Sequence, residues 1–214
     1  MVIQAVIFDM DGLLMDSERI GLDVMHECGL KQNYNIPIEM VRHTLGANKQ
    51  FASDYYHETF PALDTDRLFA DFKAAMCDLA RQGKIPLKQG ARELLEALKQ
   101  KKIPMAVASS SGMETIQIYL ESVGVIAYFD ALVTGRGFPS KPAPDIFLEA
   151  ARQLRAAPEN CLVLEDSVHG IQAGRNAGMT VCMIPDIIPY SEELKPFCDF
   201  VKPDLAAVIP LLNP

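Results

Sequence analysis

The chain has 214 residues, 49% hydrophobic and 22% charged, enough to bury one core and a small accessory unit. Its formal net charge of −8 argues against nucleic acid or an anionic membrane as partner, because both select clustered lysine and arginine. No apolar run approaches the roughly 18 to 20 residues that span a bilayer, and five scattered cysteines without a Cys-x-x-Cys pair indicate neither disulfides nor zinc. We expect a cytoplasmic globular protein, and a monomer.

The first predicted element is a strand over residues 2–8, a short apolar run. After it the strand signals stop, and only helical patterns occur, over residues 18–30, 37–45, 48–60 and 66–81. Because this segment follows the first strand, we expect it to form a helical cap over the carboxyl end of that strand, where doubly wound folds bind ligands. The alternative is that these helices belong to a single helical core.

Further along the chain, apolar runs alternate with helical patterns. Strands are predicted over residues 104–109, 131–134, 161–165 and 179–184, and helices over residues 91–101, 113–123, 145–154 and 168–177. Such alternation is typical of parallel strands joined by crossover helices. We therefore predict an α/β fold: a doubly wound parallel-sheet core of residues 1–16 and 84–214, with a small all-helical cap domain of residues 17–83 inserted after strand 1.

Acidic residues close two of the predicted strands. Asp9 and Asp11 follow the first strand, and in extended geometry their side chains share a face. Glu165 and Asp166 close the strand that begins at residue 161. Each pair alone has a structural explanation, as a turn or as a helix cap. Together they predict a Mg²⁺ site, because carboxylates from two strand ends plus a main-chain carbonyl suit an octahedral oxygen site.

Serine and lysine supply candidate phosphate ligands. Ser109 ends the second predicted strand, where a hydroxyl beside the unpaired N–H groups of a helix start forms a phosphate cradle. Ser111 with Glu114 fits a capping box, so we assign Ser111 that structural role. Lys141 lies among prolines that fix the chain around it, although a solvated surface lysine is the alternative.

These residues together predict phosphoryl transfer. Asp9 would attack phosphorus in line while Mg²⁺ and Lys141 neutralise the equatorial oxygens and Ser109 positions them. Asp11 would protonate the leaving oxygen and later activate water, so the reaction would pass through a covalent aspartyl phosphate. The helical cap would exclude water and select the leaving group.

Four motifs follow one another along the chain: Asp9-Met10-Asp11-Gly12 with residues 13–18, then Ser109, Lys141, and Glu165-Asp166-Ser167 with Gly170. These motifs, with a helical insert after the first motif, resemble those of the haloacid dehalogenase superfamily. The resemblance is to its members similar to β-phosphoglucomutase and small sugar-phosphate phosphatases. The resemblance covers essentially the whole chain. It implies a Rossmann-like core, a nucleophilic Asp9, a general acid/base Asp11, and phosphate contacts from Ser109, Ser110 and Lys141. It also implies Mg²⁺ held by Asp9, the Asp11 carbonyl and Asp166, with Glu165 close by or ligating.

We expect a phosphatase of small phosphorylated metabolites, in particular sugar phosphates. The main alternative is a β-phosphoglucomutase-type mutase, whose cap needs a second cationic site to hold a bisphosphate. Candidate substrate contacts in the cap are Gly46, Lys49, Arg42 and His43, with Lys73 as a further cation. Similar mutases place an arginine where this chain has Lys49, and a lysine lacks the bidentate fork, which favours the phosphatase. A distant alternative is a non-catalytic Mg²⁺-binding regulatory module.

Overall fold

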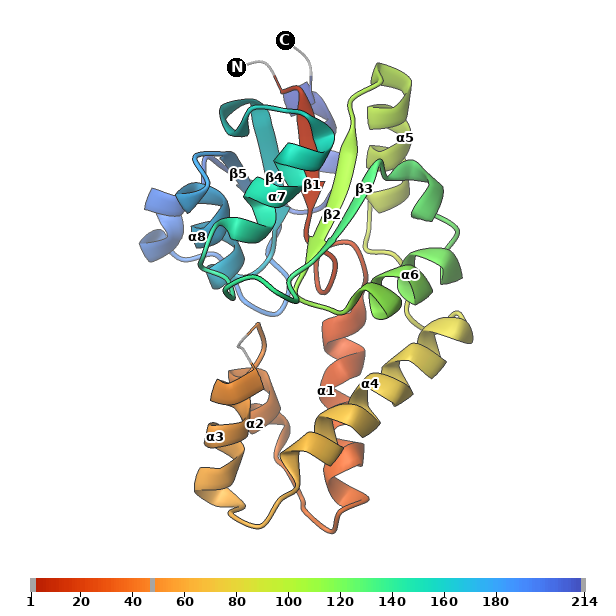
Figure 1. Ribbon diagram of the computed structural model, residues 1–214, viewed down its shortest axis with the longest axis vertical. Coiled ribbons are helices and arrows are strands. Elements are labelled where there is room, and N and C mark those ends of the chain that lie inside the picture. Colours follow the sequence, from red (N-terminus) through yellow and green to blue (C-terminus); the bar gives the residue numbers. More distant parts are fainter. Residues whose placement is uncertain (1–2, 47–48, 213–214) are drawn as a thin grey trace.

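The structure is a computed structural model that describes residues 3–46 and 49–212. Within these residues the centre is a six-stranded parallel sheet of order β3-β2-β1-β4-β5-β6 (Figure 1). The strands are β1 (Ala5–Phe8), β2 (Met105–Ser109), β3 (Ala131–Thr134), β4 (Cys161–Glu165), β5 (Thr180–Met183) and β6 (Phe200–Val201). The expected starts of the first strand at Val2 and of one helix at Asn48 lie outside the described residues.

The central strands are apolar up to their last residues, Ser109 in β2 and Glu165 in β4, because helices cover both faces of the sheet. Val6 and Phe8 of β1 pack on one face, with α5 (Ala91–Lys101), α6 (Met113–Ser122) and the C-terminal 3-10 helix (Ala206–Leu212). Ile7 packs on the other face, with α7 (Asp145–Leu154) and α8 (Val168–Asn176). The strand order reverses beside β1, as a doubly wound sheet requires, so the predicted α/β fold is confirmed. Strand β6 was not predicted.

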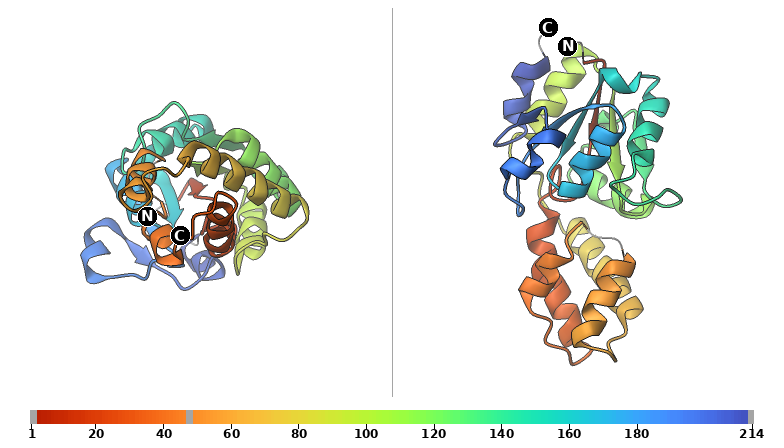
Figure 2. Two further views of the ribbon diagram at one scale, coloured as in Figure 1. Left: turned by 90° about the horizontal axis from the view of Figure 1, so that it is seen from below. Right: turned by 90° about the vertical axis from the view of Figure 1, so that its left-hand side faces the viewer.

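Between β1 and α5 the chain forms four helices within the described residues, which we call the helical unit: α1 (Ser17–Leu30), α2 (Ile38–His43), α3 (Lys49–Thr59) and α4 (Thr65–Arg81). They share a hydrophobic cluster of their own that includes Met25, Tyr56 and Leu68. Figure 2 shows the unit beyond the carboxyl ends of the strands. Helix α4 also packs on α6 of the core, where Lys73 Nζ lies 2.7 Å from Glu114 Oε2. Whether residues 17–83 form a separate domain stays a prediction.

The chain crosses between core and helical unit twice, and the two crossings pair with each other. Met15 and Leu87 form an antiparallel bridge. The Asp16 N–H donates to the Pro86 carbonyl at 2.9 Å, and the Lys88 N–H donates to the Leu14 carbonyl at 3.0 Å. The helical unit is therefore attached by a short two-stranded ribbon. Among the described residues, no helix has the length and apolarity to cross a membrane.

Candidate active site

A cavity of about 460 Å³ lies between the carboxyl ends of the strands and the helical unit. Its core wall contains most of the predicted site residues: Asp9, Asp11, Ser109, Ser110, Lys141 and Asp166. Its opposite wall is mainly apolar and comes from the helical unit: Met25, Val41, Leu45, Ala52, Phe69, Phe72 and Met76. The parallel sheet explains the convergence, because all its strands end at the same edge.

Lys141 connects the two acidic strand ends. Its Nζ donates to Asp9 Oδ1 at 2.5 Å and to Glu165 Oε1 at 2.7 Å, and lies 4.9 Å from the centroid of the Phe147 ring. The lysine side chain is only 8% exposed, so it is not the solvated surface lysine of the alternative. Burial lowers the pKa of Lys141, but the charges of Asp9 and Glu165 outweigh burial, and the net pKa is raised. The lysine therefore stays cationic beside Asp9.

Glu165 holds Lys141 and is itself held by the start of α8. Its Oε2 accepts the N–H groups of Asp166 and Ser167 and the Ser167 hydroxyl, each at 2.9 Å. Ser167 also caps α8, accepting the Gly170 N–H at 3.0 Å, as its position before that helix predicts. Both carboxylate oxygens of Glu165 are thus hydrogen-bonded.

Asp11 lies among three serine hydroxyls. Its Oδ1 accepts from Ser17 Oγ at 2.8 Å, and its Oδ2 accepts from Ser111 Oγ at 2.9 Å and from Ser109 Oγ at 3.4 Å. Burial raises the pKa of Asp11, and these hydrogen bonds oppose the rise. The prediction that Ser111 caps a helix is wrong. Gly112 is the N-cap of α6 and makes no side-chain cap, because the Ser111 hydroxyl binds the half-buried Asp11 carboxylate instead.

Three buried carboxylates at the strand ends form a candidate metal site. Asp9, Glu165 and Asp166 each place one oxygen within 4.8 Å of the others. Burial raises the pKa of Asp9 to about 7, with Lys141 opposing the rise and Glu165 adding to it. Burial, followed by the charges of Glu165 and Glu18, raises the pKa of Asp166 well above its ordinary value. A divalent cation would relieve this repulsion, and an all-oxygen ligand set fits Mg²⁺.

A second acidic group borders the first and shares Asp166 with it. Oxygens of Glu18, Asp166 and Asp186 also lie within 4.8 Å of one another. Asp186 Oδ1 binds Lys88 Nζ and Arg19 Nη2, each at 2.7 Å, whereas its Oδ2 is buried without a hydrogen-bond partner in the described part of the chain. Burial, followed by neighbouring acidic charges, raises the pKa of Glu18 to about 8. Negative charge therefore extends from the strand ends to the start of α1.

The candidates from the helical unit fall into two groups. Gly46, Lys49 and Lys73 line the cavity. Both lysines are ion-paired, Lys49 Nζ with Asp66 at 2.6 Å and Lys73 Nζ with Glu114 at 2.7 Å. Neither cation is thus free to bind a phosphate without breaking an ion pair.

Arg42 and His43 do not line the cavity as the described residues form it. Arg42 Nε lies 3.5 Å from Glu39 Oε2 one turn earlier. The His43 ring lies 4.6 Å from the Tyr55 ring, centroid to centroid, on α3. Arg42 therefore pairs within α2 itself, and His43 packs on α3.

Ser17, Glu18, Ser111 and Arg136 also line the cavity, and the sequence-based prediction gave them no catalytic or binding role. Ser17 and Glu18 belong to the first motif, and the turn at Gly12, where the Gly12 N–H binds the Met15 carbonyl at 3.0 Å, returns them to the site. Arg136 lies in the loop after β3 and carries no sequence signal.

Comparison with known proteins agrees with this geometry. The family model described as haloacid dehalogenase-like hydrolase matches residues 6–184. Hexitol phosphatase B of Escherichia coli K12 is 32% identical over 192 residues, 86% of this chain and 84% of that protein. The probable pseudouridine-5'-phosphatase of Drosophila melanogaster is 30% identical over 187 residues, 84% of this chain and 80% of that protein.

The solved structures agree as well. A putative β-phosphoglucomutase from Thermotoga maritima superposes with a TM-score of 0.78 at 25% identity, covering 98% of both chains. The extent of the family match and the named phosphatases among the relatives lead to one conclusion. The chain belongs to the haloacid dehalogenase-like hydrolase family and is a phosphatase-type enzyme of that family.

Proposed function

We propose that the protein is a Mg²⁺-dependent phosphatase of small phosphorylated metabolites, in particular sugar phosphates, acting through an aspartyl phosphate on Asp9. One observation carries the proposal. The Asp9 side chain is 10% exposed and lines the cavity, where Lys141 Nζ donates to it and an Asp166 oxygen lies within 4.8 Å of it. An anionic nucleophile beside a fixed cation and a metal site is the arrangement that phosphoryl transfer needs.

The reaction proceeds in two steps. In the first, an Asp9 oxygen attacks phosphorus, the bond from phosphorus to the ester oxygen breaks, and Asp11 gives its proton to that oxygen. In the second, Asp11 takes a proton from a water molecule, which attacks the acyl phosphate and releases inorganic phosphate. The raised pKa of Asp11, caused mainly by burial, supports its role as the acid. Ser17 and Ser111 orient its carboxyl group.

Asp9, Asp166 and the Asp11 carbonyl are the groups proposed to hold Mg²⁺, with Glu165 adjacent. When bound, the ion neutralises charge on the phosphoryl oxygens and keeps Asp9 ionised. Lys141 also neutralises charge on the phosphoryl oxygens, and Ser109 and Ser110 offer hydroxyls to them. Glu165 orients Lys141 through the 2.7 Å contact between Oε1 and Nζ.

We propose that the helical unit acts as the cap. Its apolar wall excludes water from the aspartyl phosphate, and its side chains contact the leaving group. The names of the E. coli and Drosophila relatives, which refer to hexitol and pseudouridine phosphates, support a phosphorylated sugar or sugar-like alcohol. A cytoplasmic location agrees with such a substrate.

The alternative is a sugar-phosphate mutase, which the name of the Thermotoga maritima structure favours. A mutase holds its second phosphate in the cap and protects the phosphoenzyme from water. In this chain the cap lysines that line the cavity are both ion-paired to carboxylates. That pairing supports the phosphatase.

The test is release of inorganic phosphate from p-nitrophenyl phosphate and a panel of sugar and nucleoside monophosphates, with Mg²⁺. Asp9→Asn removes the nucleophile and should abolish release, whereas Asp78→Asn, a matched change on the exposed face of α4, should leave it unchanged. Activity that survives Asp9→Asn would refute the nucleophile. Conversion of β-glucose 1-phosphate to glucose 6-phosphate, primed with a bisphosphate and without free phosphate, would establish the mutase instead.

A further inference from the structure

Arg136 differs from the other cations of the cavity. Lys49, Lys73 and Lys141 also line it, and each forms an ion pair. In the described part of the chain, the Arg136 guanidinium makes no ion pair and no hydrogen bond, although its residue lines the same cavity. Glu114, whose pKa is lowered mainly by Lys73 and slightly by Arg136, is bound by Lys73. Arg136 is therefore a cation whose donors remain free for a ligand.

The backbone of Arg136 is fixed to the serine loop that follows β2. The Thr134 hydroxyl donates to the Ser111 carbonyl at 2.7 Å, and the Gly135 N–H donates to the Ser109 carbonyl at 2.8 Å. The Arg136 N–H in turn approaches the Thr134 hydroxyl at 3.3 Å. The two loops thus form one unit, and the position of Arg136 relative to the phosphate-binding serines is set by hydrogen bonds.

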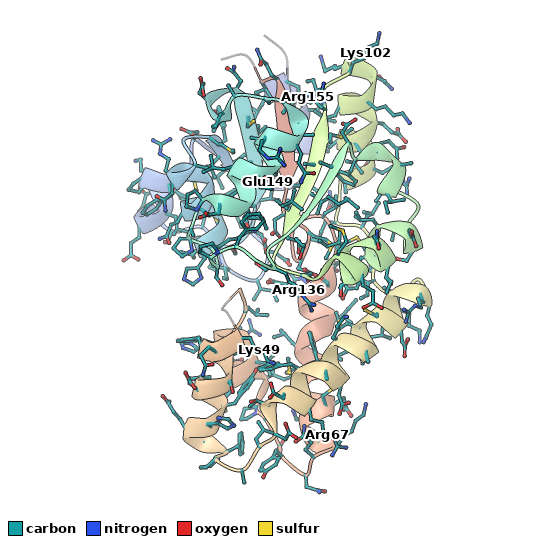
Figure 3. All side chains as sticks on the ribbon, viewed as in Figure 1. Lys49, Arg67, Lys102, Arg136, Glu149 and Arg155 are labelled. Atoms are coloured by element: carbon teal, nitrogen blue, oxygen red, sulfur yellow. The ribbon has the colours of Figure 1, made fainter. Side chains whose placement is uncertain are left out.

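Gly112 provides the place for the Arg136 side chain. A Cβ at residue 112 would lie 3.0 Å from both Cζ and Nε of Arg136, closer than ordinary packing allows. The guanidinium therefore lies against the bare backbone of Gly112, the residue that follows Ser111. Figure 3 shows Arg136 at the end of the core that faces the helical unit.

The chemistry of this position indicates its ligand. The transferred phosphoryl group belongs at Asp9 and Lys141, so Arg136 is placed to meet another part of the substrate. A guanidinium binds the paired oxygens of a carboxylate or a phosphate with two parallel hydrogen bonds. Among the described residues, the cap wall opposite is mainly apolar, and its two lysines are already paired with carboxylates.

We propose that Arg136 is a specificity-determining residue that binds a second anionic group, a carboxylate or a phosphate, on the leaving group of the substrate. This inference rests on the proposed phosphatase function. The expected substrates are therefore phosphate esters that carry a second anionic group besides the phosphate that is removed.

The experiment compares kcat/KM for glucose 6-phosphate, 6-phosphogluconate and glucose 1,6-bisphosphate, which share a hexose-derived body and differ in the second group. Arg136→Gln should lower kcat/KM about 10- to 100-fold for 6-phosphogluconate or for glucose 1,6-bisphosphate, mainly by raising KM. It should change kcat/KM for glucose 6-phosphate and for p-nitrophenyl phosphate by less than about 3-fold. Arg136→Lys should fall between, because it keeps the charge and loses the fork. Whichever of 6-phosphogluconate and glucose 1,6-bisphosphate loses more identifies the second anionic group.

Arg155→Gln is the matched control, since Arg155 is an exposed arginine at the opposite end of the core (Figure 3). It should leave all four substrates unchanged. If Arg136→Gln lowers kcat/KM equally for every substrate, or for none, the proposed role of Arg136 is wrong. Hydrolysis of p-nitrophenyl phosphate by the unaltered protein would still support the phosphatase function. Failure of the unaltered protein to hydrolyse any of the four would reject the phosphatase and this inference with it.

Discussion

Gly12 shows how one residue shapes the site. Its φ of +82° places it in the left-handed region that favours glycine, and the chain reverses there to bring Ser17 back to Asp11. A Cβ at this position would collide with Asp166 Oδ2 and come within 2.9 Å of Glu18. The two acidic strand ends can thus approach each other only because residue 12 has no side chain.

We predict that Gly12→Ala lowers kcat about 100-fold or more, because Asp166 must move away from Asp9, and displacements of about 1 Å have effects of that size. The measurement is steady-state hydrolysis with saturating Mg²⁺. Gly83→Ala is the control for backbone strain, since Gly83 has φ +70° and meets no atom within 4 Å. It should cost about 1 to 2 kcal/mol of stability and keep full activity. Similar activity losses in both variants would refute the steric explanation.

The site residues that lie directly at the end of a predicted strand could be identified from the sequence. Asp9 and Asp166 lie in the cavity because a parallel sheet aligns its strand ends, a rule that needs no coordinates. Ser111 was misassigned because a local capping pattern competes with the half-buried Asp11 carboxylate, 100 residues earlier in the chain. Arg136 was missed because hydrogen bonds to another loop determine its position, and no local pattern reports them.

Helix α7 has one buried and one exposed apolar side chain at adjacent positions. Phe147 is completely buried on the sheet face that α7 covers, and its ring also lies beneath the ammonium group of Lys141. The next residue, Leu148, turns outward and is 39% exposed. Two adjacent apolar residues of one helix thus occupy opposite environments.

Phe147→Ala should lower the free energy of unfolding by about 3 to 5 kcal/mol, since it leaves a large cavity under the sheet. Leu148→Ala, the adjacent control, should change it by about 0.5 kcal/mol or less. Urea unfolding at constant m-value measures both. A comparable loss in the two variants would contradict the assignment of the buried face.

The long helices with a periodic apolar pattern could be predicted from the sequence, whereas the shortest strand could not. The helices of the core follow the predicted ranges within a residue or two, because an apolar stripe repeats along each of them. Strand β6 has only two residues, Phe200 and Val201, too few to establish an alternating pattern. Its pairing with β5 depends on the sheet edge already being in place.

The whole molecule concentrates buried negative charge at one place. Asp9, Glu165 and Asp166 are buried at the strand ends and Asp11 is half-buried beside them, with Lys141 contacting Asp9 and Glu165. Uncompensated charges of like sign destabilise a folded state. A ligand that binds this arrangement only in the folded protein must therefore stabilise the whole chain.

We predict that Mg²⁺ at about 100 times its dissociation constant raises the free energy of unfolding by about 2.7 kcal/mol, seen as a higher Tm in calorimetry. Asp166→Asn removes one proposed ligand and should abolish most of the Mg²⁺-dependent shift. Asp54→Asn, an exposed aspartate on α3, should keep it. An undiminished shift in the Asp166 variant would place the cation elsewhere.

The paired ribbon of residues 14–16 and 86–88 limits how the helical unit can move. A unit attached by a single segment of chain can rotate about that segment. The helical unit is attached by two hydrogen-bonded segments, which resist such rotation. The freedom that remains is a bend across the ribbon, which tilts the apolar wall toward or away from the strand ends. The same tilting motion would then admit substrate and release phosphate, and its rate would set an upper limit on turnover.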